Sequence, residues 1–143
     1  MQKMKKIIVI MFWGMTSLSL YAQDNCEAFR AYLYNKEYDV FLNIDFCNES
    51  ITIPGQDLYG NIPGYIGKRK NSFCWVITSA EVNGKVATLS MINDFGSEDL
   101  KAKLIHHNDS IYILRQEEGS PLKLSQNGKW QKMPKKMEFI RQK

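Results

Sequence analysis

The sequence predicts an all-β protein: an antiparallel meander of about 8–10 short strands closed into a small barrel, with a β-sandwich as the alternative. Two Asn-Gly pairs, at residues 83–84 and 127–128, mark tight hairpins, because a type I′ turn needs residues that tolerate positive φ. Residues 38–46 alternate apolar and polar side chains throughout. No later segment carries a long apolar stripe at helical spacing. A barrel is favoured because closure leaves no strand edge exposed.

Residues 1–22 are predicted to be a signal peptide, and residues 23–143 a single β-barrel domain. Three lysines precede the apolar segment 7–20, and Tyr21-Ala22 forms a cleavage site. Cys26 lacks the small preceding residue that lipidation requires. We therefore expect a periplasmic or secreted protein that is soluble and not lipidated, with no membrane span after signal cleavage. An uncleaved N-terminal anchor is the alternative.

The charge of the mature chain gives no support to nucleic-acid binding. Removing Lys3, Lys5 and Lys6 leaves 16 basic and 15 acidic residues, so the net charge falls to about +1. Charge is nonetheless segregated, because residues 24–67 hold two basic and seven acidic residues, whereas residues 123–143 hold seven basic residues and one acid. We expect the two regions to lie side by side and neutralise each other.

The three cysteines all lie in the mature chain, so in an oxidising compartment one is left unpaired. Pairing residues 28–34 with residues 38–46 across a two-residue turn makes one face apolar and sets Cys26 opposite Cys47. A Cys26–Cys47 disulfide is therefore predicted, with Cys74 as a free thiol in the core. The alternative is a short N-terminal helix with no first strand.

Residues 56–67 combine turn residues with large apolar side chains, among them Tyr59, Ile62 and Tyr65. Such a structured loop either plugs one end of the barrel or presents aromatic groups to a partner, and plugging is the favoured interpretation.

The central hairpin, residues 73–93, has two unlike faces when residues are counted outward from Asn83-Gly84. One face is predicted to be core, and the other carries an apolar group of three residues, Trp75, Ile77 and Ile92. Either this group is a protein contact or the preceding loop or a second sheet covers it. The predicted core face consists of Cys74, Val76, Thr78, Ala80, Val82, Ala87, Leu89 and Met91.

Residues 100–107 are predicted to be a strand with His106 inward, although a short helix capped by Ser97 is the alternative. This strand is paired with residues 110–116, with Ile111 and Ile113 on the inner face. A hairpin around the second Asn-Gly turn and a closing strand at residues 137–141 complete the barrel.

In architecture the mature chain resembles the small lipocalin-like and streptavidin-like barrels of exported bacterial proteins. The Gly-x-Trp that many lipocalins carry near the first strand is absent, so the resemblance implies a barrel and no ligand cavity. In size, export and lack of lipidation the chain also resembles periplasmic immunity proteins, which implies binding of a protein partner.

No catalytic set is recognisable, and neither an enzyme nor a cofactor is predicted. There is no Gly-x-Ser-x-Gly, and the adjacent His106 and His107 point to opposite faces of a strand, where they cannot share a metal. Cys74 with His106 is a formal nucleophile and base, but a core thiol is commoner. Asp39 and Asp45 are interpreted as a solvated face.

The favoured hypothesis is an exported non-catalytic protein-binding module, in the manner of a periplasmic inhibitor or immunity protein. A carrier of a small apolar ligand in the barrel interior is the first alternative, and a cell-wall-directed hydrolase the second. Oligomeric state is left open. The predicted contact residues are Tyr59, Ile62, Tyr65, Trp75, Ile77 and Ile92.

Overall fold

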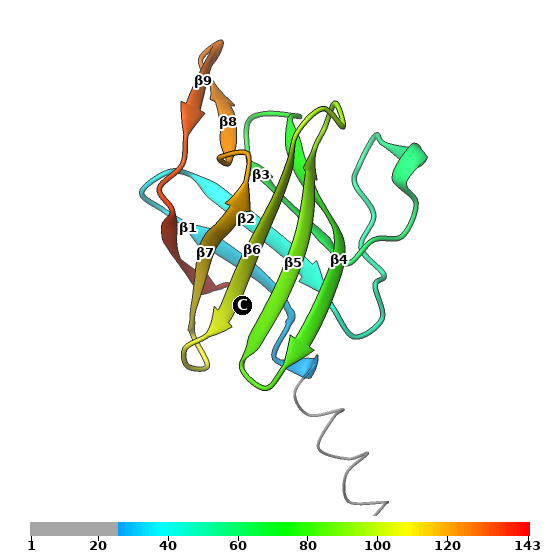
Figure 1. Cartoon of the computed structure of the whole chain (residues 1–143), viewed down its shortest axis with the longest axis vertical. Helices are drawn as coiled ribbons and strands as arrows, with labels where there is room; N and C mark the ends of the chain where they lie inside the picture. The colour runs from blue at the N-terminus through cyan, green and yellow to red at the C-terminus, as the bar shows by residue number, and fades with distance from the viewer. Residues whose placement is uncertain (1–25) are drawn as a thin grey trace, which may run out of the picture.

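Eight antiparallel strands close into a barrel, which confirms the all-β prediction (Figure 1). The computed structural model describes residues 26–143, so the predicted signal peptide lies outside the described residues. Neighbouring strands in the chain pair with each other, and β10 closes the barrel between β7 and β1. The barrel strands are β1 (Arg30–Asn35), β2 (Val40–Asp45), β3 (Gly64–Lys68), β4 (Cys74–Asn83), β5 (Val86–Asn93), β6 (Asp99–His106), β7 (Ile111–Gly119) and β10 (Lys136–Arg141).

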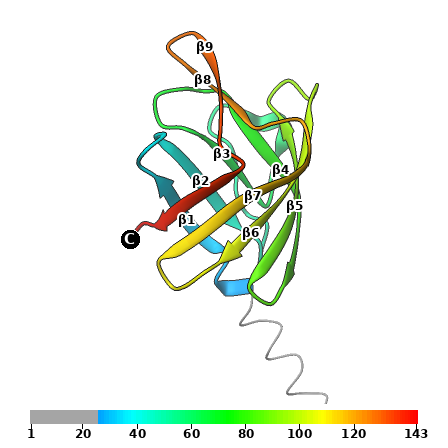
Figure 2. The ribbon, with the colours of Figure 1, turned by 60° about the vertical axis from the view of Figure 1, so that its left-hand side comes forward.

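A hairpin stands over one end of this barrel. Strands β8 (Lys123–Gln126) and β9 (Lys129–Lys132) form a separate two-stranded sheet between β7 and β10, around the predicted Asn127-Gly128 turn. Figure 2 shows this hairpin rising from the end of the barrel. Leu124 of β8 and the flanking residues Leu122 and Met133 belong to the main core, so the hairpin closes that end.

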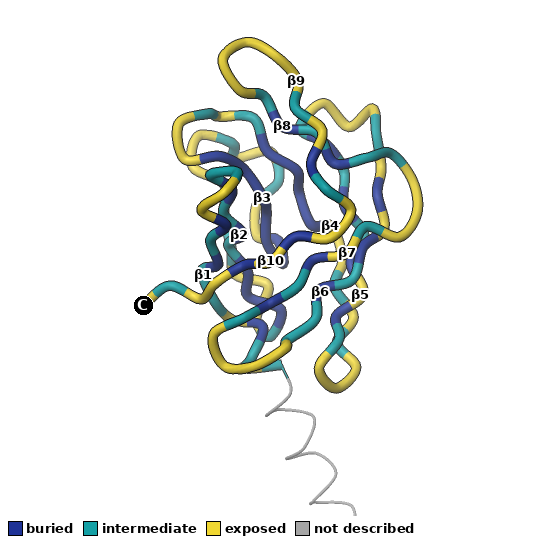
Figure 3. The backbone as a smooth tube through the Cα atoms, turned by 90° about the vertical axis from the view of Figure 1, so that its left-hand side faces the viewer, coloured by how far each residue is buried: buried dark blue, intermediate teal, exposed yellow. Residues whose placement is uncertain are grey.

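Side chains from the barrel strands form one continuous buried cluster in the interior. Figure 3 shows where buried residues lie along the strands. An eight-stranded barrel is just wide enough for inward side chains to meet at its axis. The largest fully buried side chains are Trp75, Tyr112, Phe29 and Phe139.

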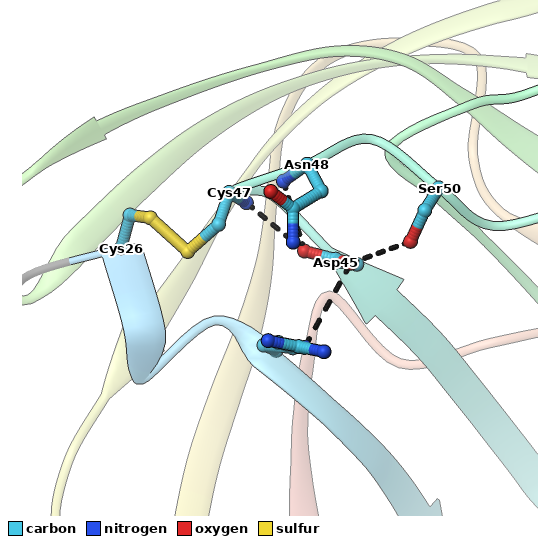
Figure 4. Close-up of a disulfide and its surroundings, with 6 residues drawn as sticks. Cys26, Asp45, Cys47, Asn48 and Ser50 are labelled. Atoms are coloured by element: carbon cyan, nitrogen blue, oxygen red, sulfur yellow. Dashed lines mark hydrogen bonds and ion pairs between the residues drawn. A yellow bond between two sulfur atoms is a disulfide. The ribbon is translucent and has the colours of Figure 1, made fainter. Parts of the chain in front are cut away.

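The predicted Cys26–Cys47 disulfide is present, with Cα atoms 5.3 Å apart (Figure 4). The predicted register of β1 and β2 was wrong by two residues, since Leu33 lies opposite Leu42 and the turn contains residues 36–39. Because side chains alternate with period two, this shift leaves the inward face unchanged. Residues 26–29 form a helical turn, in which the Phe29 N–H donates to the Cys26 carbonyl at 2.9 Å. This turn shortens the chain before β1, which compensates for the two-residue change in register and brings Cys26 to Cys47.

A β-bulge in β4 overturns part of the predicted central hairpin. Near the turn, Ala87, Leu89 and Met91 face the core as predicted. The register shifts by one residue between Ile77 and Ser79, which reverses the faces of the first half of β4. Trp75 and Ile77 therefore point into the barrel and are fully buried, whereas the predicted core residues Cys74 and Val76 lie in a second cluster outside the barrel wall.

Residues 99–106 form strand β6, which confirms the preference for a strand over a helix. The predicted pairing with β7 was wrong by one residue, because His106 lies opposite Tyr112 and the turn is longer than two residues. The side chain of Asn108 accepts hydrogen bonds from the N–H groups of Ser110 and Ile111, both at 2.9 Å, and so widens the turn. Tyr112 and Leu114, and not Ile111 and Ile113, consequently face the core.

Strand β3 takes up the end of the segment predicted to be a loop, residues 56–67, and extends one residue beyond it. Gly64 allows β3 to approach β2 closely, since a Cβ there would collide with the backbone of Asn43 and Ile44. The rest of the segment includes the 3₁₀ turn η1 (Asp57–Tyr59) and lies against the outside of β4, where Ile62 is part of the second cluster. It does not plug the barrel end, because the β8–β9 hairpin occupies the end above Trp75.

Within residues 26–143 no helix has the length and apolar character needed to span a lipid bilayer.

Candidate functional site

The six predicted contact residues do not form one surface. Trp75 and Ile77 are fully buried inside the barrel because of the bulge, so their predicted place on an exposed face was wrong. The other four lie on the outside of the barrel wall, in or against the second cluster, and only two of the four are partly accessible. These four are Tyr59 and Ile92, which are half-buried, and Ile62 and Tyr65, which are buried.

Tyr59 has a structural contact in this arrangement. Its hydroxyl donates to the carbonyl of Asp94 at 3.0 Å, which joins the loop to the turn between β5 and β6. The loop thereby covers Cys74 and Val76. Of the three residues that the covering alternative named, only Ile92 lies against this cluster, since Trp75 and Ile77 belong to the barrel interior.

An exposed aromatic cluster lies elsewhere, beside the β8–β9 hairpin. Phe95 and Trp130 are 74% and 57% exposed, which is unusual for such large apolar side chains. Both contact Phe73: ring centroids lie 4.7 Å apart for Phe73 and Trp130, and 5.6 Å apart for Phe73 and Phe95. A cleft of about 220 Å³ opens among them. This aromatic cleft is lined by Phe73, Trp75, Asn93, Phe95, Ser97, Glu98, Lys123 and Trp130.

The turn between β5 and β6 presents Phe95 to solvent. The buried side chain of Asn93 accepts hydrogen bonds from the N–H groups of Ser97 at 2.9 Å and Glu98 at 3.3 Å, and it donates to the Ser97 hydroxyl at 3.1 Å. Gly96 has a φ of 72°, which few other residues adopt. These bonds close the turn around Asn93 and leave Phe95 at its outer side.

The hairpin that carries Trp130 is fixed to the barrel by polar contacts. The Trp75 indole N–H donates to the Lys123 carbonyl at 2.8 Å, and the Asn71 side chain donates to the Ser125 carbonyl at 2.8 Å. Trp75 is thus both the floor of the cleft and an anchor for β8. Trp130 is held on a rigid element, although it is itself exposed.

Lys68 adds a third tether. Its ammonium group is buried and donates to the side-chain oxygens of Gln126 at 2.8 Å and Gln131 at 3.2 Å, and to the Tyr38 carbonyl at 2.8 Å. Burial lowers the pKa of Lys68, and the charge of Asp39 opposes this shift. All three protons are satisfied by neutral oxygens, one each from β8, β9 and the turn between β1 and β2.

The cleft lining carries one ion pair, and two further lysines lie in the neighbouring strand β9. Glu98 and Lys123 form an ion pair of 3.8 Å on its lining, whereas Lys129 and Lys132 are exposed and form no ion pair with any described residue. The acidic and basic regions are adjacent where β1 pairs with β10, but no ion pair among the described residues joins residues 24–67 to residues 123–143.

The groups considered for catalysis are not assembled. Cys74 belongs to the outer cluster, where burial raises the pKa of its thiol to about 12, while His106 lies beside Phe29 and Tyr112 inside the barrel end. Burial also lowers the pKa of His106. Asp45, interpreted from sequence as solvated, is buried. Within residues 26–143 no cluster of His, Cys, Asp or Glu has the arrangement of a metal site.

Sequence reasoning missed Phe73, Phe95 and Trp130. Two of them carried a usable signal, because Phe95 stands beside Gly96 in a turn and Trp130 follows the second Asn-Gly turn by two positions. A large aromatic residue at a turn of a small barrel has little core to reach.

Comparisons of this chain with protein-family models, with curated proteins and with solved structures give no match.

Proposed function

We propose that this chain is an exported, non-catalytic protein-binding module, and that its aromatic cleft receives one apolar side chain of the partner protein. The observation that carries the proposal is the exposure of Phe95 and Trp130 around a cleft whose floor and walls are held by hydrogen bonds. Aromatic residues on a rigid support are typical centres of protein interfaces, since they lose little conformational entropy when they bind.

The size and lining of the cleft favour a side chain over a free small molecule. Its volume of about 220 Å³ is below the range of roughly 300–1,000 Å³ that is usual for small-molecule sites. Ser97, Glu98 and Lys123 give the aromatic centre a polar margin, as in protein interfaces.

The filled barrel interior favours the protein-binding hypothesis over the hypothesis of a small-molecule carrier. Side chains from opposite walls form one continuous cluster in the interior, where a carrier needs room for its ligand. The separation of Cys74 from His106 likewise favours a binding role over a hydrolase.

Export is the setting that this proposal assumes. The Cys26–Cys47 disulfide is suited to an oxidising compartment, and the N-terminal segment has the composition of a signal peptide. A periplasmic inhibitor or immunity protein is the form of binding module that best suits these features.

Position-dependent photo-crosslinking tests the proposal. A benzophenone amino acid is placed at Phe95, on the cleft, or at Ile140, which is 53% exposed on β10, in cells that naturally produce the protein. We expect one defined partner to be crosslinked from position 95 and not from position 140. Trp130→Ala should reduce the yield at position 95 at least tenfold, because interface centres contribute about 2 kcal/mol or more. Equal yields at both positions, or no effect of Trp130→Ala, would exclude the cleft as the binding site.

A further inference from the structure

The outer edge of β9 is an unpaired strand edge. β9 is the last strand of a two-stranded sheet, so one side pairs with β8 and the other has no neighbour. In Figure 1 this strand stands at the margin of the molecule, away from the barrel wall. Unpaired edges offer backbone N–H and C=O groups to another chain.

Three hydrogen bonds identify which backbone groups point outward. Met133 N–H donates to the Leu122 carbonyl at 2.8 Å, so these two residues form a hydrogen-bonded pair across the hairpin. Hydrogen-bonded and non-hydrogen-bonded pairs alternate along an antiparallel ladder. The next pair, Lys123 with Lys132, is therefore non-hydrogen-bonded, as is Ser125 with Trp130.

The contacts of β8 agree with this alternation. The carbonyls of Lys123 and Ser125 accept hydrogen bonds from the side chains of Trp75 and Asn71, and hence point away from β9. By the same pattern, Trp130 and Lys132 direct their N–H and C=O groups to the open edge of β9. Within the described chain, no side chain or loop backbone bonds to them.

The outward face of the hairpin is basic and aromatic. Cross-strand partners share a face, so Lys123, Ser125, Trp130 and Lys132 lie on one side, opposite to the side of Leu124 that enters the core. Lys123 and Lys132 are like charges directly opposite each other, which is destabilising unless anions neutralise them. Glu98 pairs with Lys123, whereas Lys132 has no carboxylate among the described residues at ion-pair distance.

We propose that β9 accepts an extended segment of the partner protein as a third antiparallel strand, with an acidic residue opposite Lys132 and a large apolar residue opposite Trp130. Residues two apart in a strand share a face, so the partner carries the order acidic-x-apolar. The inference rests on the proposed function for the partner being a protein, and it adds the conformation and charge of the segment that binds.

The lysines also argue against a second copy of this chain as the occupant. Lysines commonly protect strand edges, because pairing with a like-charged strand is unfavourable. An antiparallel pair of β9 strands centred on Gln131 would set each Lys132 opposite a Trp130 of the other copy, so Lys132 would meet no carboxylate. An acidic strand supplies that carboxylate, and the exposed Trp130 supplies apolar contact.

Nuclear magnetic resonance titration with synthetic peptides tests the inference. The probe is the peptide Ser-Thr-Val-Glu-Thr-Trp-Thr-Val-Ser, with matched peptides that carry Lys in place of Glu or Ala in place of Trp. We expect the Glu-Thr-Trp peptide to shift and protect the amides of Trp130 and Lys132, and to bind at least tenfold more tightly than either matched peptide. Lys132→Glu should reverse the preference between the Glu and Lys peptides.

A pair of variants separates strand addition from simple charge attraction. Lys132→Ala removes the charge alone, while Lys132→Pro also removes the outward N–H and leaves the bonds to β8 intact. The proline variant should bind the Glu peptide several-fold more weakly than the alanine variant. Equal binding by these two variants, or no charge reversal with Lys132→Glu, overturns the proposed strand. If the peptide titration gives either of these results while crosslinking from position 95 is still observed, only the proposal of strand addition to β9 is excluded. Absence of crosslinking from position 95 contradicts the proposed function itself.

Discussion

Asp45 is a buried carboxylate with a structural purpose next to the disulfide (Figure 4). It accepts hydrogen bonds from the Ser50 hydroxyl at 2.6 Å and from the N–H groups of Asn48 at 3.0 Å and Cys47 at 3.2 Å. Burial alone would raise the pKa of Asp45, but the bond from Ser50 and those from the backbone outweigh it and lower that pKa. The ionised carboxylate therefore stabilises the chain segment after β2.

Asp45→Asn should lower the free energy of unfolding at pH 7 by about 1–3 kcal/mol, because donors lose their charged acceptor. A pKa below that of the unfolded state, near 3.9, means that this stability is present above pH 4 and is lost as the pH falls through the folded pKa. Denaturant unfolding from pH 7 to pH 2 should thus show the gap between wild type and variant closing at low pH. Asp57→Asn, at an exposed position, is the control. A gap that stays constant with pH would contradict the role of the charge.

The Cys74 thiol should be unreactive in the native protein. It is buried in the outer cluster, and burial raises its pKa to about 12, so almost no thiolate exists near neutral pH. We expect alkylation by iodoacetamide at pH 8 to be slow in buffer and rapid in denaturant, as followed by mass spectrometry. Rapid native labelling would show that the loop does not cover this site.

At the scale of elements, small changes in register decide what can be predicted. The predicted register of β1 with β2 was wrong by two residues, but each side chain was still assigned to the correct face of its strand, because alternation repeats every two residues. One-residue shifts, at the β4 bulge and at the turn before β7, reversed faces and moved Trp75 and Tyr112 into the core. A bulge depends on packing from other strands, so alternation along one strand does not reveal it.

Strand β3 was missed for a related reason. Glycines 64 and 67 resemble turn residues in sequence, but here they permit close approach of neighbouring strands, which only the assembled barrel requires. The candidate site escaped prediction in the same way, since Phe73, Phe95 and Trp130 come from three elements that the barrel brings together.

Lys68 should control the rigidity of the β8–β9 hairpin. Lys68→Met removes three hydrogen bonds from a charged donor, which are worth about 1.5–3 kcal/mol each when formed. We expect amide exchange in β8 and β9 to accelerate at least tenfold, while exchange in β5 and β6 is far less affected. Lys70→Met, at an exposed lysine two residues away, should change neither. Equal acceleration throughout the barrel would mean that Lys68 stabilises the whole fold and not the hairpin.

At the scale of the whole molecule, the barrel was predictable because turns and alternation are local signals that repeat along the chain. The disulfide links residues 21 positions apart at the end of the barrel opposite the hairpin, where β1 begins and β2 ends (Figure 1). It leaves the hairpin end to be stabilised by Trp75, Lys68 and Asn71.

Replacing Cys26 and Cys47 by serine should lower the free energy of unfolding by about 3 kcal/mol, the value expected for a loop of this length. Chemical unfolding of the double variant and of reduced wild type should give the same stability. A reduced wild type as stable as the oxidised protein would contradict a stabilising role for the bridge.

The two tryptophans of the described chain have opposite roles in this account: Trp75 supports the hairpin from inside, and Trp130 is proposed to contact the partner. Acrylamide quenching of fluorescence tests both in a Trp13→Phe background, with either Trp75→Phe or Trp130→Phe added. With Trp130 alone, we predict quenching near that of free indole, suppressed when the crosslinked partner, once purified, is added. With Trp75 alone, we predict weak quenching with or without partner. Strong quenching of Trp75, or quenching of Trp130 that the partner does not change, would contradict the account.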